Sequence, residues 1–268
     1  MDYLVMFADY VDKLAKQGKC YFTLKEAQKS LGKSASAIRS SINHLKIKGR
    51  LAKPIYGFYV IVPPEYQSQG CIPAEQFIPY LMEFLGCNYY AALLSAASYF
   101  GASHQAVQLY QVIIDKNWPQ SINCGKVRIK FYIKKNILDS ITEKKNTPKS
   151  ILNVSTPEQT AFDLITYSKA SGGLSHIATI LEELQESIDL TKFKQIVARC
   201  SENPIKQRLG YILEQIGAYD MAEIIKADLD NRRYVKYIPL LGNNVPNTEI
   251  TKNAKWKIIE NTIIESDI

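Results

Sequence analysis

Apolar and polar positions recur with a helical period near the start of the chain. In residues 23–31 and 36–46, apolar side chains return every three or four positions, so each segment has one apolar stripe. Gly32 and Lys33 separate the two segments, and the Ser34 hydroxyl can cap the second one. The pattern predicts two short amphipathic helices joined by a tight turn.

The period changes after the second of these helices. Gly49 ends the helical pattern, residues 51–53 and 58–62 have the composition of strands, and residues 54–57 form a turn. Residues 2–17 are expected to form a further helix, which packs behind the other two. A helix-turn-helix followed by a short hairpin is the arrangement of a winged helix-turn-helix.

The remaining residues predict a larger domain of helices and a small sheet. Two prolines at 63 and 64 end the last strand, and the polar residues 67–73 are expected to form a linker, with a boundary near residue 68. The expected fold class is therefore α+β, with a winged helix-turn-helix domain at 1–66 and a mixed domain at 74–268. Helices are expected at 74–85, 89–97, 158–168, 174–186, 190–200 and 205–216, and strands at 107–114, 127–133, 234–239 and 255–259.

The distribution of charge distinguishes a DNA-binding surface from an ordinary helical surface. Between Lys13 and Tyr56 the basic residues are opposed by a single acid, Glu26, in a chain of net charge +7. Half to two-thirds of protein–DNA hydrogen bonds go to phosphates and sugars, so this concentration of charge favours double-stranded DNA as a partner. The expected DNA contacts lie in the turn, on the outer face of the second helix and in the wing: Lys33, Ser34, Ser36, Arg39, Ser40, Asn43, Lys46, Lys53 and Tyr56.

Composition argues against several other classes of protein. No apolar run approaches the ~20 residues of a membrane span, and the first residues lack the pattern of a signal peptide. The five cysteines are scattered without metal-ligand spacing, which is typical of idle thiols in a reducing cytoplasm. We therefore expect a cytoplasmic protein without a membrane partner, metal or cofactor.

Candidates for catalysis are few. His104 is the best-placed histidine, although a capping role at a tight corner is the favoured interpretation. Asp163 lies among apolar residues and is expected to be buried, with Arg208 as one candidate partner. The helix dipole accounts for Glu158 in a first helical turn. With no phosphate-binding glycine loop or nucleophile elbow, no catalytic residue is assigned.

A succession of short motifs extends along most of the chain. They occupy residues 57–60, 89–97, 101–105, 155–160 with Asp163, 172–173 and 207–210. Together they resemble the AbiEi family, antitoxins of type IV toxin–antitoxin systems and phage defence. The resemblance implies that the winged helix binds an operator and represses its own operon. It also implies that the C-terminal domain, with His104, Asp163 and Arg208 as its candidate residues, counteracts a nucleotidyltransferase-fold toxin without a stable complex.

Two other functions stay open at this point. One is a nucleic-acid-processing enzyme that the winged helix targets to its substrate, with Glu158, Asp163 and His104 in its site. The other is a transcriptional regulator that senses a small ligand, because apolar pockets leave no clear trace in a sequence. A neighbouring reading frame for a nucleotidyltransferase would favour the antitoxin, whereas a metal-dependent activity lost in Asp163→Asn would favour the enzyme.

Overall fold

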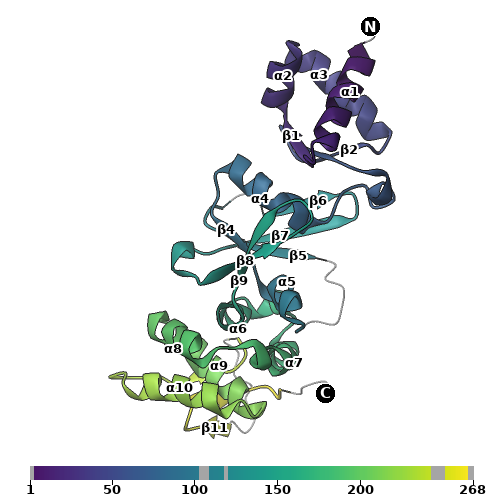
Figure 1. Ribbon diagram of the computed structural model, residues 1–268. Helices are drawn as coiled ribbons and strands as arrows, with labels where there is room; N and C mark the ends of the chain where they lie inside the picture. The colour runs from purple at the N-terminus through teal and green to yellow at the C-terminus, as the bar shows by residue number, and fades with distance from the viewer. Residues whose placement is uncertain (1–2, 103–108, 118–119, 243–250, 265–268) are drawn as a thin grey trace. The chain divides into compact units, whose positions relative to one another are not determined.

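The computed structural model describes residues 3–102, 109–117, 120–242 and 251–264 of the chain (Figure 1). The chain divides into two compact units, one within residues 1–91, 108–139 and 143–154, the other within residues 92–107, 140–142 and 155–268. Helices and sheets occur in both units, which confirms the predicted α+β class. Among the described helices, none is both long and apolar enough to cross a bilayer.

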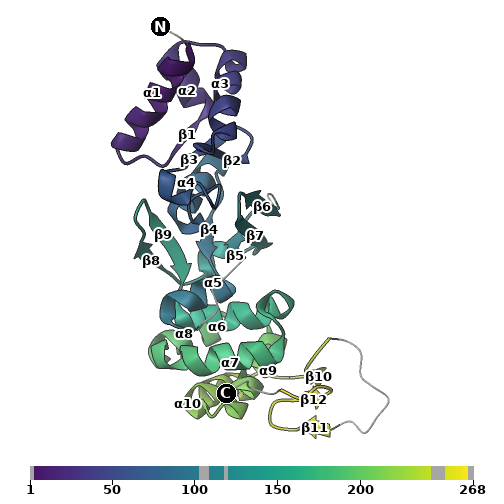
Figure 2. The same ribbon diagram turned by 90° about the vertical axis from the view of Figure 1, so that its right-hand side faces the viewer.

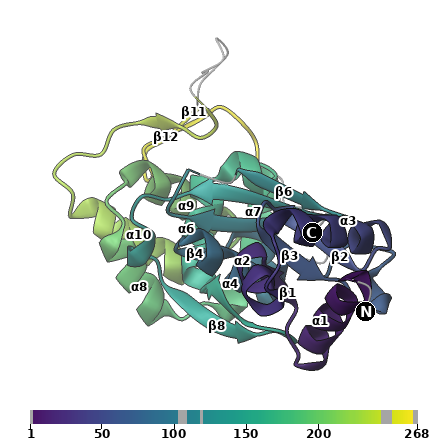
Figure 3. The same ribbon diagram turned by 90° about the horizontal axis from the view of Figure 1, so that it is seen from above.

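Three helices and a three-stranded antiparallel sheet form the beginning of the first unit, with α3 alongside the wing strands (Figure 3). The sheet order is β1-β3-β2, and the order of elements along the chain is that of a winged helix. The pattern of the sequence does not predict β1. The elements are α1 (Tyr3–Lys16), β1 (Tyr21–Thr23), α2 (Leu24–Leu31), α3 (Ala35–Ile47), β2 (Leu51–Ile55) and β3 (Phe58–Ile61).

Local signals set the ends of α2. The Thr23 hydroxyl accepts a hydrogen bond from the Glu26 N–H at 3.2 Å, and the Glu26 carboxylate accepts one from the Thr23 N–H at 2.6 Å. This reciprocal pair is a capping box, which satisfies two N–H groups that the helix itself cannot pair. Gly32 ends the helix at φ +61°, a backbone conformation that favours glycine.

The segment between the winged helix and the next helix is packed into the first unit. Cys71 and Ile72 are 0% and 1% exposed. The backbone of Gly70 lies so close to Gly125 that a Cβ on Gly125 would come within 2.8 Å of the Gly70 Cα. Residues 67–69 are exposed, whereas residues 70–72 pack into the first unit beside the turn at Gly125, so the predicted linker is held by contacts far along the chain over part of its length.

Aromatic side chains connect the winged helix to α4 (Ala74–Leu85), which follows the short helix η1 (Pro64–Tyr66). Tyr80 stacks on Tyr21 with ring centroids 4.6 Å apart, and Phe84 packs on Phe58 at 5.6 Å. The boundary predicted near residue 68 thus falls inside one compact unit. A division of activities there stays a prediction.

A six-stranded mixed sheet completes the first unit (Figure 1). The strand order is β6-β7-β5-β4-β9-β8. β7 has the bounds that its alternating pattern predicts, whereas β6, β8 and β9 are not predicted. The strands are β4 (Tyr89–Ala91), β5 (Tyr110–Ile114), β6 (Ser121–Cys124), β7 (Val127–Ile133), β8 (Thr142–Asn146) and β9 (Ile151–Ser155), with the short helix η3 (Ile137–Asp139) before β8.

The apolar run at residues 89–97 is a strand followed by the short helix α5 (Leu93–Ala97), where its composition predicts a single helix. Tyr90 lies opposite Ile113 of β5, and β4 also pairs with β9. A central strand whose side chains are buried on both faces has the same continuous apolar composition as a buried helix. Only the pairing with distant strands distinguishes the two.

The second unit is mainly helical and ends in a small sheet that lies beside α9 (Figure 2). Four of its helices agree with the prediction to within a few residues, and α10 is not predicted. The main helices are α6 (Pro157–Thr166), α7 (Leu174–Leu184), α8 (Leu190–Arg199), α9 (Asn203–Gln215) and α10 (Tyr219–Asp230). The strands are β10 (Ile238–Pro239), β11 (Thr251–Asn253) and β12 (Ile258–Glu260), and the short helices are η2 (Ser98–Phe100), η4 (Ser168–Ser171) and η5 (Gln185–Ser187).

Candidate functional site

Helix α3 has one buried face and one exposed polar face. Ile38, Ile42 and Leu45 are at most 4% exposed and join the core of the winged helix. The Ser34 hydroxyl caps the helix by accepting a hydrogen bond from the Ala37 N–H at 3.3 Å. Lys46 is half-buried. The remaining predicted contact residues of the turn and helix are exposed: Lys33, Ser36, Arg39, Ser40 and Asn43.

The wing lies next to this polar face. The turn at Tyr56 and Gly57 joins β2 to β3, and Tyr56 is 65% exposed. The Arg39 guanidinium carbon lies 5.8 Å from the centroid of the Tyr56 ring, which is within the range of a cation–π contact. Lys53 is exposed on β2. The structure therefore brings two predicted DNA contacts, one from the helix and one from the wing, together.

A second group of polar side chains lies buried on α6. Thr156 caps the helix by accepting from the Gln159 N–H at 3.4 Å. The Glu158 carboxylate is 1% exposed and accepts from the Asp189 N–H at 2.8 Å. Asp163 is also 1% exposed and accepts from the Gln159 amide at 3.0 Å. The sequence therefore predicts the burial of Asp163 correctly.

The carboxylate of Asp163 also affects a neighbouring phenol. Burial, and then the negative charges of Asp163 and Glu202, raise the pKa of Tyr167 to about 12. Tyr167 therefore stays protonated at neutral pH. His104 lies outside the described residues, so its expected role has no structural counterpart here.

Arg208 does not pair with Asp163, and this expectation is wrong. Its Nε donates to the Leu240 carbonyl and its Nη2 to the Pro239 carbonyl, each at 3.0 Å. Burial lowers the pKa of Arg208. The guanidinium instead holds the backbone of the C-terminal segment at two carbonyls.

Gln207 has a related role that sequence reasoning missed. Its amide nitrogen lies 2.9–3.1 Å from the carbonyl oxygens of Lys236, Trp256 and Lys257. Gln207 is 1% exposed. Neighbouring side chains of α9 thus hold the end of the chain at several carbonyls, and no local sequence pattern indicates these acceptors.

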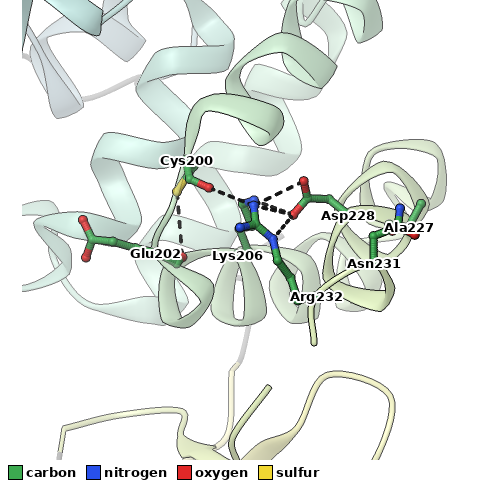
Figure 4. A network of polar contacts seen from close by, with 7 residues as sticks. All are labelled: Cys200, Glu202, Lys206, Ala227, Asp228, Asn231 and Arg232. Atoms are coloured by element: carbon green, nitrogen blue, oxygen red, sulfur yellow. Dashed lines mark hydrogen bonds and ion pairs between the residues drawn. The ribbon is translucent and has the colours of Figure 1, made fainter. Parts of the chain in front are cut away.

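An ion-pair network joins α9 to α10 (Figure 4). Lys206 is 0% exposed, and its ammonium donates to the Asp228 carboxylate. Arg232 contacts the same carboxylate at 3.2 Å and donates to the Cys200 carbonyl at 3.5 Å. Figure 4 shows both cations directed towards Asp228, which compensates the burial of the lysine. This network was not predicted either.

Surface grooves occur away from the predicted residues. One of about 370 Å³ lies between the start of α8 and the start of α10, and its lining includes Leu190 and Tyr219. Another of about 540 Å³ lies between α4 and the turn after β8. Neither Asp163 nor Arg208 lines these two grooves. In the described part of the chain, no three His, Cys, Asp or Glu side chains gather as metal ligands would.

Comparison with known proteins assigns a family to one segment of the chain. Residues 90–215 match the family model of the AbiEi antitoxin C-terminal domain. The crystal structure of the RV2827C protein from Mycobacterium tuberculosis is similar, with a TM-score of 0.66 over 95% of this chain and 91% of that chain. Because the two sequences are 15% identical, this similarity concerns the fold alone. A comparison with curated proteins finds no match.

The motifs at residues 101–105, 155–160 and 207–210 all fall within the matched segment. The family is a class of antitoxins, which implies a toxin as partner. Residues 90–215 therefore form a domain of the AbiEi antitoxin C-terminal type.

Proposed function

We propose that this antitoxin also binds double-stranded operator DNA and represses its own operon. In this proposal residues 1–66 bind the DNA, and residues 74–268 counteract a nucleotidyltransferase-fold toxin in the cytoplasm without a stable complex and without enzymatic activity. The observation that carries the proposal is an antitoxin domain on the same chain as a winged-helix arrangement with an exposed, basic α3.

The geometry of α3 supports base contacts. Arg39 and Asn43 are four residues apart, so their side chains lie one above the other on the exposed face. Arginine pairs with guanine and asparagine with adenine in the major groove. Lys53 on the wing is suited to a phosphate, and the contact of Tyr56 with Arg39 joins the wing to the helix.

The buried carboxylates of α6 favour an antitoxin over a nucleic-acid-processing enzyme. Glu158 accepts a backbone N–H of Asp189, and Asp163 accepts the amide of Gln159 on its own helix. Both are 1% exposed, so a substrate has little access to them. We therefore expect the wild-type chain to have no metal-dependent nuclease or transferase activity that the Asp163→Asn substitution abolishes.

Co-expression with the toxin tests the antitoxin assignment. The full chain, expressed from an unrelated promoter, should restore growth to cells that produce the nucleotidyltransferase encoded beside it. The double variant Arg39→Ala/Asn43→Ala should rescue equally well while losing repression of an operon reporter. Failure of the wild-type chain to rescue would overturn the antitoxin proposal. Rescue that depended on Arg39 and Asn43 would show that protection acts through repression alone.

A further inference from the structure

Strand β7 carries a row of basic and aromatic side chains on one face. Arg128, Lys130 and Tyr132 occupy alternate positions of β7, and Lys134 follows at the next alternate position. Arg128 is exposed and the other three are half-buried. Side chains at alternate positions of a strand point to the same face of the sheet, so these four form one row.

The opposite face of β7 belongs to the core of the first unit. Ile129 is 0% and Phe131 5% exposed, and α4 packs against this strand. The buried face therefore fixes the register of β7, since a shift by one residue would place the charged row in the core.

The neighbouring edge strand adds polar groups to the row. Ser121 lies opposite Lys130 and Asn123 opposite Arg128 in the antiparallel pair of β6 and β7. Both residues of β6 are exposed. A hydroxyl and an amide, each able to donate and accept hydrogen bonds, thus lie beside two cations.

No ion pair within the described residues neutralises the positive charge of Arg128 and Lys130. Residues 108–154 contain nine Lys and Arg against three Asp and Glu. Within the described part of the chain, neither Arg128 nor Lys130 has an ion pair with an acidic side chain. Uncompensated charge on a folded surface lowers stability by self-repulsion, and it attracts anionic partners.

The two aromatic rings near the row are held in place. The Gln111 amide lies 3.5 Å from the Tyr132 hydroxyl. The Lys134 ammonium lies 5.8 Å from the centroid of the Tyr90 ring and donates to its hydroxyl at 3.3 Å. Tyr90 is 1% exposed, so Tyr132, which is half-buried, is the ring that a base can reach. A fixed ring beside cations is the combination on which unpaired bases stack.

We propose that this face of β7 binds the backbone of a single-stranded nucleic acid. Cations at alternate positions of a strand are about 6.6–6.8 Å apart, and they can follow the phosphates of an extended strand. Tyr132 offers a stacking surface, as the aromatic residues of sheet platforms do. β7 is flanked by β6 on one side and β5 on the other, so the row is not on a two-stranded ribbon that could enter the major groove of a duplex.

Fluorescence anisotropy with the full chain tests this site. The probes are a labelled mixed-sequence RNA of about 20 nucleotides, DNA of the same sequence, and the corresponding duplex, titrated over a range of KCl concentrations. The test variant is Arg128→Gln/Lys130→Gln. The control Lys144→Gln/Lys149→Gln removes the same charge from exposed positions at the other edge of the sheet. All titrations are repeated in an Arg39→Ala/Lys53→Ala background, which weakens binding by the winged helix.

In the Arg39→Ala/Lys53→Ala background, the chain should bind the single strands more tightly than the duplex of the same sequence. Each phosphate contact contributes about 0.7 to the slope of log affinity against log salt, so the test variant should reduce that slope by about 1.4. Its affinity should fall about tenfold, whereas the control should change less than about twofold. Tighter binding of RNA than of DNA would indicate an additional contact with 2′-hydroxyl groups. Ser121 and Asn123 lie beside the two cations and can make this contact.

Three results would overturn the proposal: no binding of single strands by the wild type, equal losses in the test and control variants, or a preference for the duplex in the Arg39→Ala/Lys53→Ala background. Thermal unfolding of each variant verifies that it is folded. Operator binding is measured on the same proteins and should be unchanged in the β7 variant. If the wild-type chain does not bind the operator, only the proposed role of the winged helix is contradicted. The two proposals can therefore fail separately.

Discussion

At the scale of single residues, Arg39 combines two features. It lies on the exposed face of α3, and its guanidinium lies over the ring of Tyr56 in the wing. A planar donor held by an aromatic ring loses less side-chain freedom when it binds a base edge. The contribution of Arg39 to binding should therefore depend on the base sequence of the DNA, whereas the contribution of a lysine that contacts phosphate should not.

We expect Arg39→Ala to weaken binding to the operator by about 1–3 kcal/mol and to relax base preference. Lys53→Ala should weaken binding to operator and random DNA alike, and reduce the salt slope by about 0.9. Titrations on both duplexes across a salt series measure these effects. Equal losses on the two duplexes for Arg39→Ala would contradict a base contact.

Glu214 is a residue whose ionisation supports the end of the chain. Its carboxylate accepts from the Lys255 ammonium at 2.5 Å and from the Trp256 indole N–H at 2.6 Å. Burial acts to raise the pKa of Glu214, but these two hydrogen bonds outweigh it, so the pKa lies below the ordinary value of 4.5. A carboxyl with a lowered pKa stabilises the fold above that ordinary value, and this stabilisation disappears as pH falls through the folded-state pKa.

The stability of the second unit should therefore decline below about pH 4.5, and less steeply in Glu214→Gln. Urea unfolding followed by Trp fluorescence at several pH values between about 6 and 3 measures the decline. The exposed Glu186→Gln is the matched control. An identical acid dependence in wild type and Glu214→Gln would show that the carboxylate has no such role.

At the scale of elements, one glycine decides how α9 meets the C-terminal sheet. Trp256 is 0% exposed and lies directly on Gly210. A Cβ at position 210 would come 2.1 Å from the indole ring, which is far inside van der Waals contact. The close approach of ring and helix backbone therefore requires glycine in the middle of a helix, where alanine would otherwise favour helix formation.

We expect Gly210→Ala to displace Trp256 and destabilise the second unit by about 1–3 kcal/mol, as overpacked cores do. The emission maximum of Trp fluorescence should shift to longer wavelength as the ring becomes exposed. Gln215→Ala, at an exposed position near the end of the same helix, should change neither quantity. A more stable Gly210→Ala protein would mean that the ring can move at little cost.

At the scale of the whole molecule, the two compact units differ in net charge more than the two segments on either side of residue 68 do. The first unit contains twenty Lys and Arg against ten Asp and Glu, whereas the second contains thirteen against sixteen. The basic character of the winged helix thus extends into the six-stranded sheet. Nucleic-acid binding is accordingly a property to be tested in the sheet as well as in α3.

The packing of α4 on the winged helix predicts how fragments behave. A fragment of residues 1–86 should be more stable than residues 1–66 by at least about 2 kcal/mol, because Tyr80 and Phe84 cover Tyr21 and Phe58. Urea unfolding followed by circular dichroism compares the two. A fragment of residues 1–73, which lacks α4, is the control. Equal stability of all three would mean that the winged helix folds independently of α4.

Features that depend on neighbours in sequence could be predicted. The caps at Thr23 and Ser34, the bounds of α4 and β7, and the start of α6 all rest on side chains within a few residues of one another. Their energies are local, so periodicity and capping residues suffice. The exposed face of α3 follows from the same periodicity. The repeat of Met221, Ala222, Ile225 and Leu229 is also local, so α10 could have been predicted.

Features that depend on distant partners were decided only by the tertiary structure. The run at residues 89–97 is apolar enough for a helix, and pairing with β5 and β9 makes its first part a strand. Asp163 is buried as expected, but Gln159 donates to it, and Arg208 instead holds carbonyls near β10. Composition indicates that a side chain will be buried, because burial follows from apolar neighbours. Which group it meets depends on contacts between residues far apart in the chain, and a single sequence carries no direct record of them.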